Sequence, residues 1–192
     1  ARWMGFGKSF QDGCKINVHI SGRQGPTGII KAIPRLSPEA RNLLTIENDE
    51  MGWGLESSLE LEKHCALVLD IHHHWVRTGE YIQAKDDRVK RVIDSWRGTR
   101  PTMHYSYSRD EWLSPAYPNQ DDMHKELHDM ETLLSKGCKK QKLRAHSELL
   151  PNRASNEWAL TFLPELNIQV EAKMKNLAAE QLHHQAVELG YI

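Results

Sequence analysis

The sequence predicts an α/β fold in which parallel strands alternate with helices. Short apolar runs alternate with stretches whose apolar residues recur at helical spacing, and a His, Asp or Glu follows or ends each run. Because parallel strands end at one edge of a sheet, these polar side chains are expected to share one rim. The 192 residues are enough for one core, so we expect a single domain over residues 1–192. Five strand-helix units are visible, which leaves two possibilities: part of an eight-unit TIM barrel, or an open sheet.

Composition excludes several classes of protein. The formal net charge is −1 with 27% charged residues, so any DNA contact must come from a local basic patch. The three cysteines have no C-x-x-C spacing, which argues against a disulfide scaffold or a zinc ribbon and favours a reduced, cytoplasmic environment. No apolar run approaches the length of a membrane span, so no membrane partner is expected. Eleven histidines indicate metal binding.

The first strand is expected over residues 15–20. Residues 1–13 precede it as a weak helix or an irregular lead-in. The alternating run 15–20 places His19 near the carboxyl end of this strand. A loop rich in glycine and proline covers 21–27, and a helix starts at Thr27.

The second strand ends in an acidic turn. Ser37 and Pro38 begin a short helix, with proline at the first helical position. The strand 43–46 then runs into Glu47-Asn48-Asp49-Glu50. These three carboxylates repel one another unless a cation or a basic partner holds them, so the turn is either a cation site or a solvated loop.

The third strand is the centre of the pattern. An amphipathic helix over 57–64 leads into the buried run 67–69, which ends in Asp70 and three histidines, residues 72–74. In an extended chain Asp70 and His72 share a face, whereas a strand that runs out into a loop makes Asp70 with His73 equally feasible. A loop is expected over 75–81.

The fourth strand, 101–106, places His104 near its end. The helix 86–97 precedes it, and its apolar stripe belongs to the core. Residues 107–145 form a longer insertion, with a loop and then a polar helix over 121–136. A basic run follows, and it is the best local candidate for phosphate contact: Lys139, Lys140, Lys142 and Arg144.

The last strand, 166–173, carries Glu171 near its end, and a helix from Asn176 to Gly190 closes the chain. The strand ends together therefore offer imidazole and carboxylate ligands, a mixture that suits Mn²⁺, Zn²⁺ or Fe²⁺ better than Mg²⁺ or Ca²⁺. The strand ends offer six or more such side chains, which are too many for one ion. Two or three adjacent ions would activate a water for in-line displacement at phosphorus.

Five short stretches within residues 16–178 together resemble the UV damage endonuclease family: 44–49 (LTIEND), 67–74 (LVLDIHHH), 103–106 (MHYS), 144–147 (RAHS) and 170–173 (VEAK). The resemblance implies a xylose-isomerase-like TIM barrel, of which this chain is the C-terminal part. It also implies a cluster of divalent ions, typically manganese, and incision of damaged double-stranded DNA on the 5′ side of a UV photoproduct. The implied metal ligands are His19, Glu47, Asp70, His73, His104, His146 and Glu171.

Two departures from the family pattern are visible. The family has a lysine, often carbamylated, two residues before the histidine of the fourth predicted strand, where this chain has Thr102. Threonine cannot supply that bridging carboxylate, so metal occupancy or its pH dependence is expected to differ. The first strands of the barrel, with a further histidine ligand, are also expected to lie outside this sequence.

The expected function is that of a metal-dependent endonuclease, acting as a monomer on damaged DNA in the cytoplasm or bacterial nucleoid, or in a eukaryotic nucleus. Glu47 and Asp70 are its expected catalytic carboxylates. A sugar isomerase or epimerase is the second possibility, because related barrels place two ions on the same rim, and Lys173 would then be a candidate catalytic group. The third is a non-catalytic DNA-binding remnant.

Overall fold

The computed structural model describes residues 1–192 and confirms an α/β chain with parallel strands. The strands are β1 (Ile16–His19), β2 (Leu44–Glu47), β3 (Ala66–Val68), β4 (Thr102–Tyr105) and β5 (Asn167–Val170). The α-helices are α1 (Gly25–Ala32), α2 (Pro38–Leu43), α3 (Leu55–Leu59), α4 (Ile71–Thr78), α5 (Asp87–Ser95), α6 (Asp110–Leu113), α7 (Gln120–Met123), α8 (Met130–Ser135), α9 (Lys140–Leu143), α10 (Arg153–Leu160) and α11 (Asn176–Glu188). Short 3₁₀ turns cover Arg2–Met4 and Ile33–Arg35.

The strands form two parallel sheets in the order β1-β2-β3 and β4-β5. A single parallel bridge between Asp70 and His104 joins them, and the His104 backbone N–H donates to the Leu69 carbonyl at 2.9 Å. All five strands therefore run in the same direction, with their carboxyl ends on one side. β1 pairs only with β2 and β5 only with β4, so the strands form an open arrangement and not a closed barrel.

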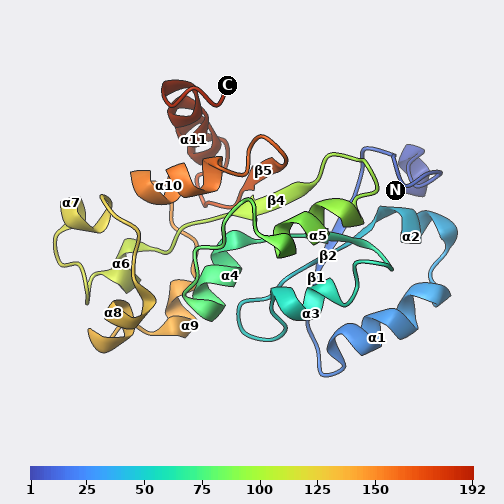
Figure 1. The fold of residues 1–192 in the computed structure, drawn as a ribbon, viewed down its shortest axis with the longest axis horizontal. Helices are drawn as coiled ribbons and strands as arrows, with labels where there is room; N and C mark the ends of the chain where they lie inside the picture. The colour runs from blue at the N-terminus through green and yellow to red at the C-terminus, as the bar shows by residue number, and fades with distance from the viewer.

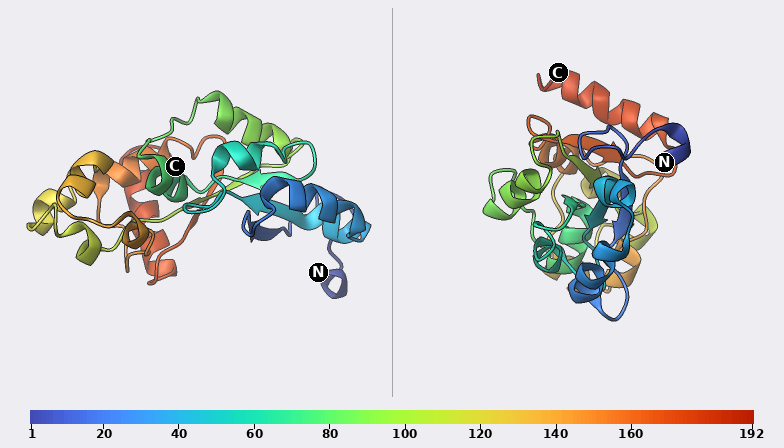
Figure 2. Two further views of the ribbon diagram at one scale, coloured as in Figure 1. Left: turned by 90° about the horizontal axis from the view of Figure 1, so that it is seen from below. Right: turned by 90° about the vertical axis from the view of Figure 1, so that its right-hand side faces the viewer.

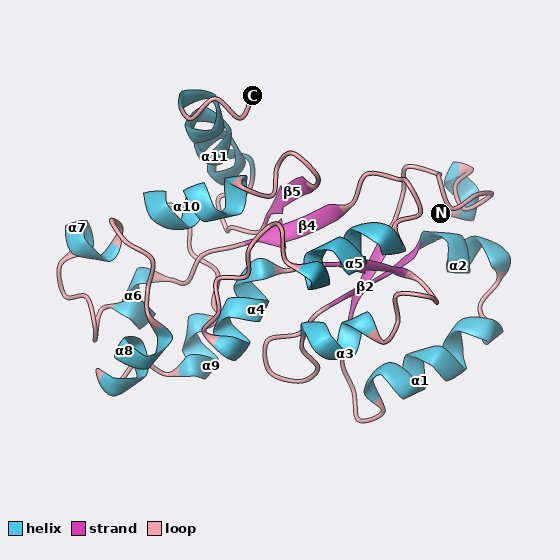
Figure 3. Ribbon diagram, viewed as in Figure 1, coloured by secondary structure: helices cyan, strands magenta, loops and turns pink.

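One main apolar core of 34 buried residues packs the helices onto the strands. β3 is buried along its whole length, whereas all four residues of β1 are exposed. The strands cross the middle of an elongated molecule, as Figure 3 shows. Helices α1–α3 lie toward one end and the short helices α6–α9 at the other, an arrangement seen from two directions (Figures 1 and 2). None of the helices combines the length and apolar character needed to cross a bilayer.

The structure corrects several predicted boundaries. The loop expected over 75–81 is wrong, because α4 starts directly after Asp70 and runs to Thr78. The polar helix expected over 121–136 is also wrong: it is broken into α7 and α8, since the Asp129 side chain accepts from the Thr132 N–H at 2.7 Å and starts a new helix. The helix predicted over 57–64 lies at Leu55–Leu59, and no helix was expected at α10. The last strand is shorter than predicted, ending at Val170.

Candidate metal centre

Four side chains from four neighbouring strands converge at the carboxyl ends of the sheets. Glu47 ends β2, Asp70 follows β3, His104 lies in β4 and Glu171 follows β5. One ligand atom of each lies within 4.8 Å of the others. His104 Nδ1 lies 3.1 Å from Glu47 Oε1 and 3.2 Å from Glu171 Oε1. The rim expected from the strand ends is therefore present as a compact, largely buried group.

Asn48 fixes the ends of β2 and β3 beside each other. Its side-chain amide donates to the Asp70 carbonyl at 2.9 Å, and its Oδ1 accepts from the Asp70 N–H at 2.8 Å, as a neighbouring strand would. Asp70 in turn caps α4: its Oδ1 accepts from the His73 N–H at 2.7 Å. The cap uses one carboxylate oxygen and leaves Oδ2 facing the cluster.

Three atoms of the cluster are buried and make no hydrogen bond of acceptable geometry, although two of them, His104 Nδ1 and Glu47 Oε1, lie 3.1 Å apart; the third is Asp70 Oδ2. Buried polar atoms are nearly always paired, and a buried carboxylate oxygen without a donor is costly. A divalent ion between them would satisfy all three at once. Carboxylate and imidazole are also ligands that Mn²⁺, Fe²⁺ and Zn²⁺ accept together, so the residues present fit a metal.

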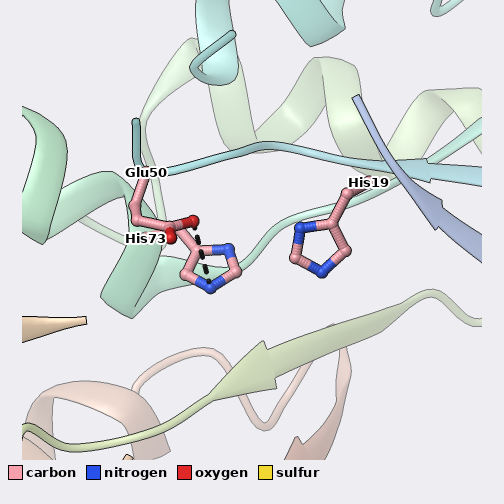
Figure 4. Close-up of side chains that lie close together, drawn as sticks. All are labelled: His19, Glu50 and His73. Atoms are coloured by element: carbon pink, nitrogen blue, oxygen red, sulfur yellow. Dashed lines mark ion pairs between the residues drawn. The ribbon is translucent and has the colours of Figure 1, made fainter. Parts of the chain in front are cut away.

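A second group of possible ligands adjoins the first and comprises His19, Glu50 and His73. His73 Nε2 lies 3.6 Å from Glu50 Oε2, and Figure 4 shows this carboxylate against the His73 ring with the His19 ring to one side. The His19 and His73 ring centres are 5.3 Å apart. Glu47 lies between the groups, since its carboxylate oxygens are 3.4 Å from both His19 Nε2 and His73 Nδ1.

The raised pKa values of two histidines indicate that the cluster favours positive charge. Burial lowers the pKa of His73, but the carboxylates of Asp70, Glu50 and Glu47 outweigh it and raise that pKa above its ordinary value. The pKa of His104 is also raised, because Glu47 and Glu171 outweigh its burial. Burial raises the pKa of Asp70 to about 6. A metal ion would replace these protons as the counter-charge.

Two further histidines lie near the cluster: His146 lies beside His73, whereas His72 faces away from the carboxylates. The His146 ring centre lies 6.5 Å from that of His73, and burial lowers the pKa of His146. His72 is buried but faces Ser106 Oγ at 2.8 Å and Ser108 Oγ at 3.0 Å. Of the two pairings left open for Asp70, the structure therefore brings His73 and not His72 into the cluster.

The basic run expected to contact DNA is largely engaged by the protein itself. The Lys140 ammonium donates to the Arg77 carbonyl, and Lys142 lies over the Trp112 ring, 4.5 Å from its centre. Arg144 Nε lies 2.6 Å from Oε1 of the buried Glu50. Only Lys139 is exposed without a side-chain partner.

Two further residues bear on the site. Lys173 lies outside both ligand groups, with its Nζ 3.7 Å from Glu148 Oε1. Glu50 was not among the expected ligands, although the acidic turn that contains it was recognised as a possible cation site. Its position depends on the turn after β2, which folds the chain back toward α4, and the strand pattern does not predict that turn.

Comparison with known proteins supports a relationship to UV-damage endonucleases. The chain is 32% identical over 114 residues to a UV-damage endonuclease of Neurospora crassa, a match to 51% of this chain and 17% of the relative. It is 29% identical over 119 residues to a UV DNA damage endonuclease of Bacillus pumilus, covering 56% of this chain and 36% of the relative. These matches therefore span only a part of each relative's length.

The fold has a solved counterpart in the crystal structure of SacUVDE. The TM-score is 0.64 at 21% identity, over 93% of this chain and 53% of that chain. The family model described as UV-endonuclease UvdE matches residues 8–191, nearly the whole sequence. The chain belongs to the UV-endonuclease UvdE family.

Proposed function

We propose that this chain is the metal-binding part of a DNA repair endonuclease that incises damaged double-stranded DNA on the 5′ side of UV photoproducts. The observation that supports the proposal most is the convergence of buried, unpaired ligand atoms on Glu47, Asp70 and His104 in a chain of the UvdE family. The relatives it matches are named as UV-damage endonucleases. We also propose that its five parallel strands correspond to five of the eight units of a TIM barrel.

The proposed metal ligands fall into two adjoining positions. Glu47, Asp70, His104 and Glu171 would hold one ion. His19, Glu50 and His73 would hold a second, with His146 at its edge. Because Glu47 lies within 3.4 Å of histidines of both groups, it is the carboxylate best placed to bridge them. We propose two or three divalent ions, with Mn²⁺ as the native metal.

The chemistry proposed for the centre is hydrolysis of a phosphodiester. Bound divalent ions would supply Lewis acidity, activating a water and stabilising the attacking and leaving oxygens. The protein's contribution is to fix the ligands: Asn48 holds Asp70, and the α4 cap orients it. The buried surroundings strengthen the electrostatic interactions of the site by excluding water.

A nicking assay tests this function directly. A duplex with one UV photoproduct and a labelled 5′ end is incubated with the full chain and Mn²⁺, and the fragment length locates the cut. We expect a cut on the 5′ side of the lesion that a chelator abolishes. A Glu47→Gln variant should lose the cut, whereas Glu60→Gln, which removes an exposed carboxylate, should keep it. Binding of the damaged duplex without any cut would overturn the nuclease and favour a non-catalytic DNA-binding protein.

A further inference from the structure

We propose that Lys173 and Lys175 form a phosphate-binding subsite for the DNA strand, in a cavity that adjoins the metal centre. This inference rests on the proposed function and names the part of the protein that would hold the substrate backbone. It moves the expected phosphate contact away from the basic run at residues 139–144 to the segment after β5.

The cavity has a volume of about 640 Å³ and lies between two segments, 144–146 and 169–175. The Lys173 N–H donates to the Ser147 carbonyl at 3.0 Å and the Met174 N–H to the Glu148 carbonyl at 2.9 Å, so the two segments are tied together. His146 and Glu171 both line the cavity. The cavity is therefore continuous with the proposed metal ligands.

The two lysines are available to an anion. Lys175 is exposed, and its side chain makes no hydrogen bond or ion pair in the structure. Lys173 pairs only with Glu148, at 3.7 Å and with both side chains about half exposed, a contact of little energy. Glu171 is the sole carboxylate among the lining residues, and it faces His104. Two lysine ammonium groups without strong partners therefore line the cavity and are free to bind a phosphate.

The other basic residues near the centre are less suited to this role. Arg144 also lines the cavity, but its guanidinium is paired with the buried Glu50 carboxylate at 2.6 Å. Moving it onto DNA would break this close ion pair with a buried carboxylate, which is costly. Lys140 and Lys142 are held by Arg77 and Trp112.

The backbone holds the two lysines in a fixed relation. The Lys175 N–H donates to the Ala172 carbonyl at 3.1 Å, closing a turn, and Lys175 adopts a φ of +50°, a positive value that side-chain-bearing residues rarely adopt. Phosphates of one DNA strand repeat about every 3.4 Å along the helix axis. A strand whose scissile phosphate lies at the metal ligands would therefore place a neighbouring phosphate over this cavity.

The salt dependence of DNA binding tests the subsite. Binding of a fluorescent UV-irradiated duplex to the full chain is measured by anisotropy at several salt concentrations, with a chelator present so that no cutting occurs. Each phosphate contact contributes about −0.9 to the slope of log affinity against log salt. We expect Lys173→Gln with Lys175→Gln to make the slope shallower by about 1.8 and to weaken binding by about tenfold per lysine near 0.1 M salt.

The matched control is Lys31→Gln with Lys90→Gln, which removes the same charge from exposed lysines of α1 and α5, outside the cavity. The control should keep the wild-type slope, and Lys173→Arg with Lys175→Arg should restore it. An equal slope for the wild type and the Lys173/Lys175 double glutamine variant, with nicking retained, overturns the subsite alone. A wild type that neither binds nor nicks overturns the proposed function and the subsite with it.

Discussion

Glu47 contacts histidines from three different elements: His19 of β1, His73 of α4 and His104 of β4. Its side chain is fully buried, and although burial raises the pKa of a carboxyl, these histidines, His104 first, hold it below its usual value. A buried, ionised carboxylate among imidazoles is a strong position for a cation. The sequence predicted this residue because it is the polar end of a buried strand. It did not predict Glu50, whose approach to His73 depends on the fold of a loop.

Thr102 lies in β4, two residues before His104, and lines a polar cavity together with Asn17, Thr45 and His104 itself. Thr45 donates to Asn17 Oδ1 at 3.0 Å, and Asn17 donates to Glu47. The polar inner face of the strands therefore supports Glu47 by hydrogen bonds. This support involves neutral groups, so it adds no ligand in place of the carboxylate that Thr102 cannot supply.

His128 makes the stability of the fold dependent on pH. The residue is buried, and burial, with neighbouring His124 adding to the effect, lowers its pKa to about 4. Its unfolded pKa is about 6.5, so the unfolded chain binds the proton first as pH falls. The neutral His128 ring therefore stabilises the fold fully above about pH 6.5. As the pH falls from about 6.5 to 4, the free energy of unfolding decreases by up to about 3 kcal/mol.

Urea unfolding across this pH range measures the effect. We expect His128→Gln to make the free energy of unfolding depend less steeply on pH, because one of the buried histidines that titrate is gone, whereas His183→Gln on the exposed face of α11 should leave that dependence unchanged. If the free energy of unfolding of His128→Gln varied with pH as steeply as that of the wild type, other groups would cause the pH dependence.

At the scale of elements, α4 shows what a strand pattern can and cannot predict. Asp70 follows a buried strand, and that much is visible in the sequence. The three histidines after it lie on a helix, where successive side chains point about 100° apart. His72 therefore reaches Ser106, His73 reaches the carboxylates, and His74 pairs with Glu80 at 2.9 Å. Which histidine becomes the proposed ligand depends on the cap that Asp70 makes at the start of α4, and strand alternation alone does not predict that cap.

The segment 107–145 was expected as a loop with one polar helix, and it contains four short ones. Their buried residues are few and widely spaced: Leu113, Met123, Met130, Leu133 and Leu143. Each short helix contributes only one or two side chains to the core. The sequence of this segment therefore has no long apolar stripe from which these helices could be predicted. Local caps decide the boundaries instead, as at Asn119 and Asp129.

Asn152 holds α10 against this segment. Its Oδ1 caps the helix by accepting from the Ser155 N–H at 2.8 Å, and its amide donates to the carbonyls of Met123 at 3.0 Å and Glu126 at 2.8 Å. We expect Asn152→Ala to lower the free energy of unfolding by about 3 kcal/mol, because it removes a cap together with the buried amide that donates to the Met123 and Glu126 carbonyls. Asn119→Ala, an exposed cap with one bond to Asp121, should cost no more than about 1 kcal/mol. Chemical denaturation compares the two, and equal losses would contradict the bridging role of Asn152.

At the scale of the whole molecule, the succession of strands along the chain and their shared rim could be predicted because they follow from apolar runs and their polar ends. Whether the strands close into a barrel could not be predicted. Each strand run predicts a strand but not its partners, and β1 has all four residues exposed with a single neighbour. Ile16 and Val18 on this strand are about half exposed. The exposed edge is a property of how the strands pair, and pairing is not visible in any one run.

Metal binding should stabilise the whole fold, since the proposed ligands come from β1, β2, α4, β4 and the segment after β5. An ion at about one hundred times its dissociation constant adds about 2.7 kcal/mol. For a domain of this size that corresponds to a rise in Tm of about 5–10 °C. Thermal unfolding of the full chain with Mn²⁺ and with a chelator measures the difference. Equal Tm values in the two conditions would mean that the folded state binds no metal more tightly than the unfolded chain.

The central claim is that the strand ends hold divalent metal through Glu47. Elemental analysis of the full chain after dialysis against Mn²⁺, compared with the Glu47→Gln variant, tests it most directly. We expect at least two ions per wild-type chain and a loss of at least one ion in Glu47→Gln, with both proteins folded by circular dichroism. A wild type without bound metal, or a variant with the same metal content as the wild type, would contradict it.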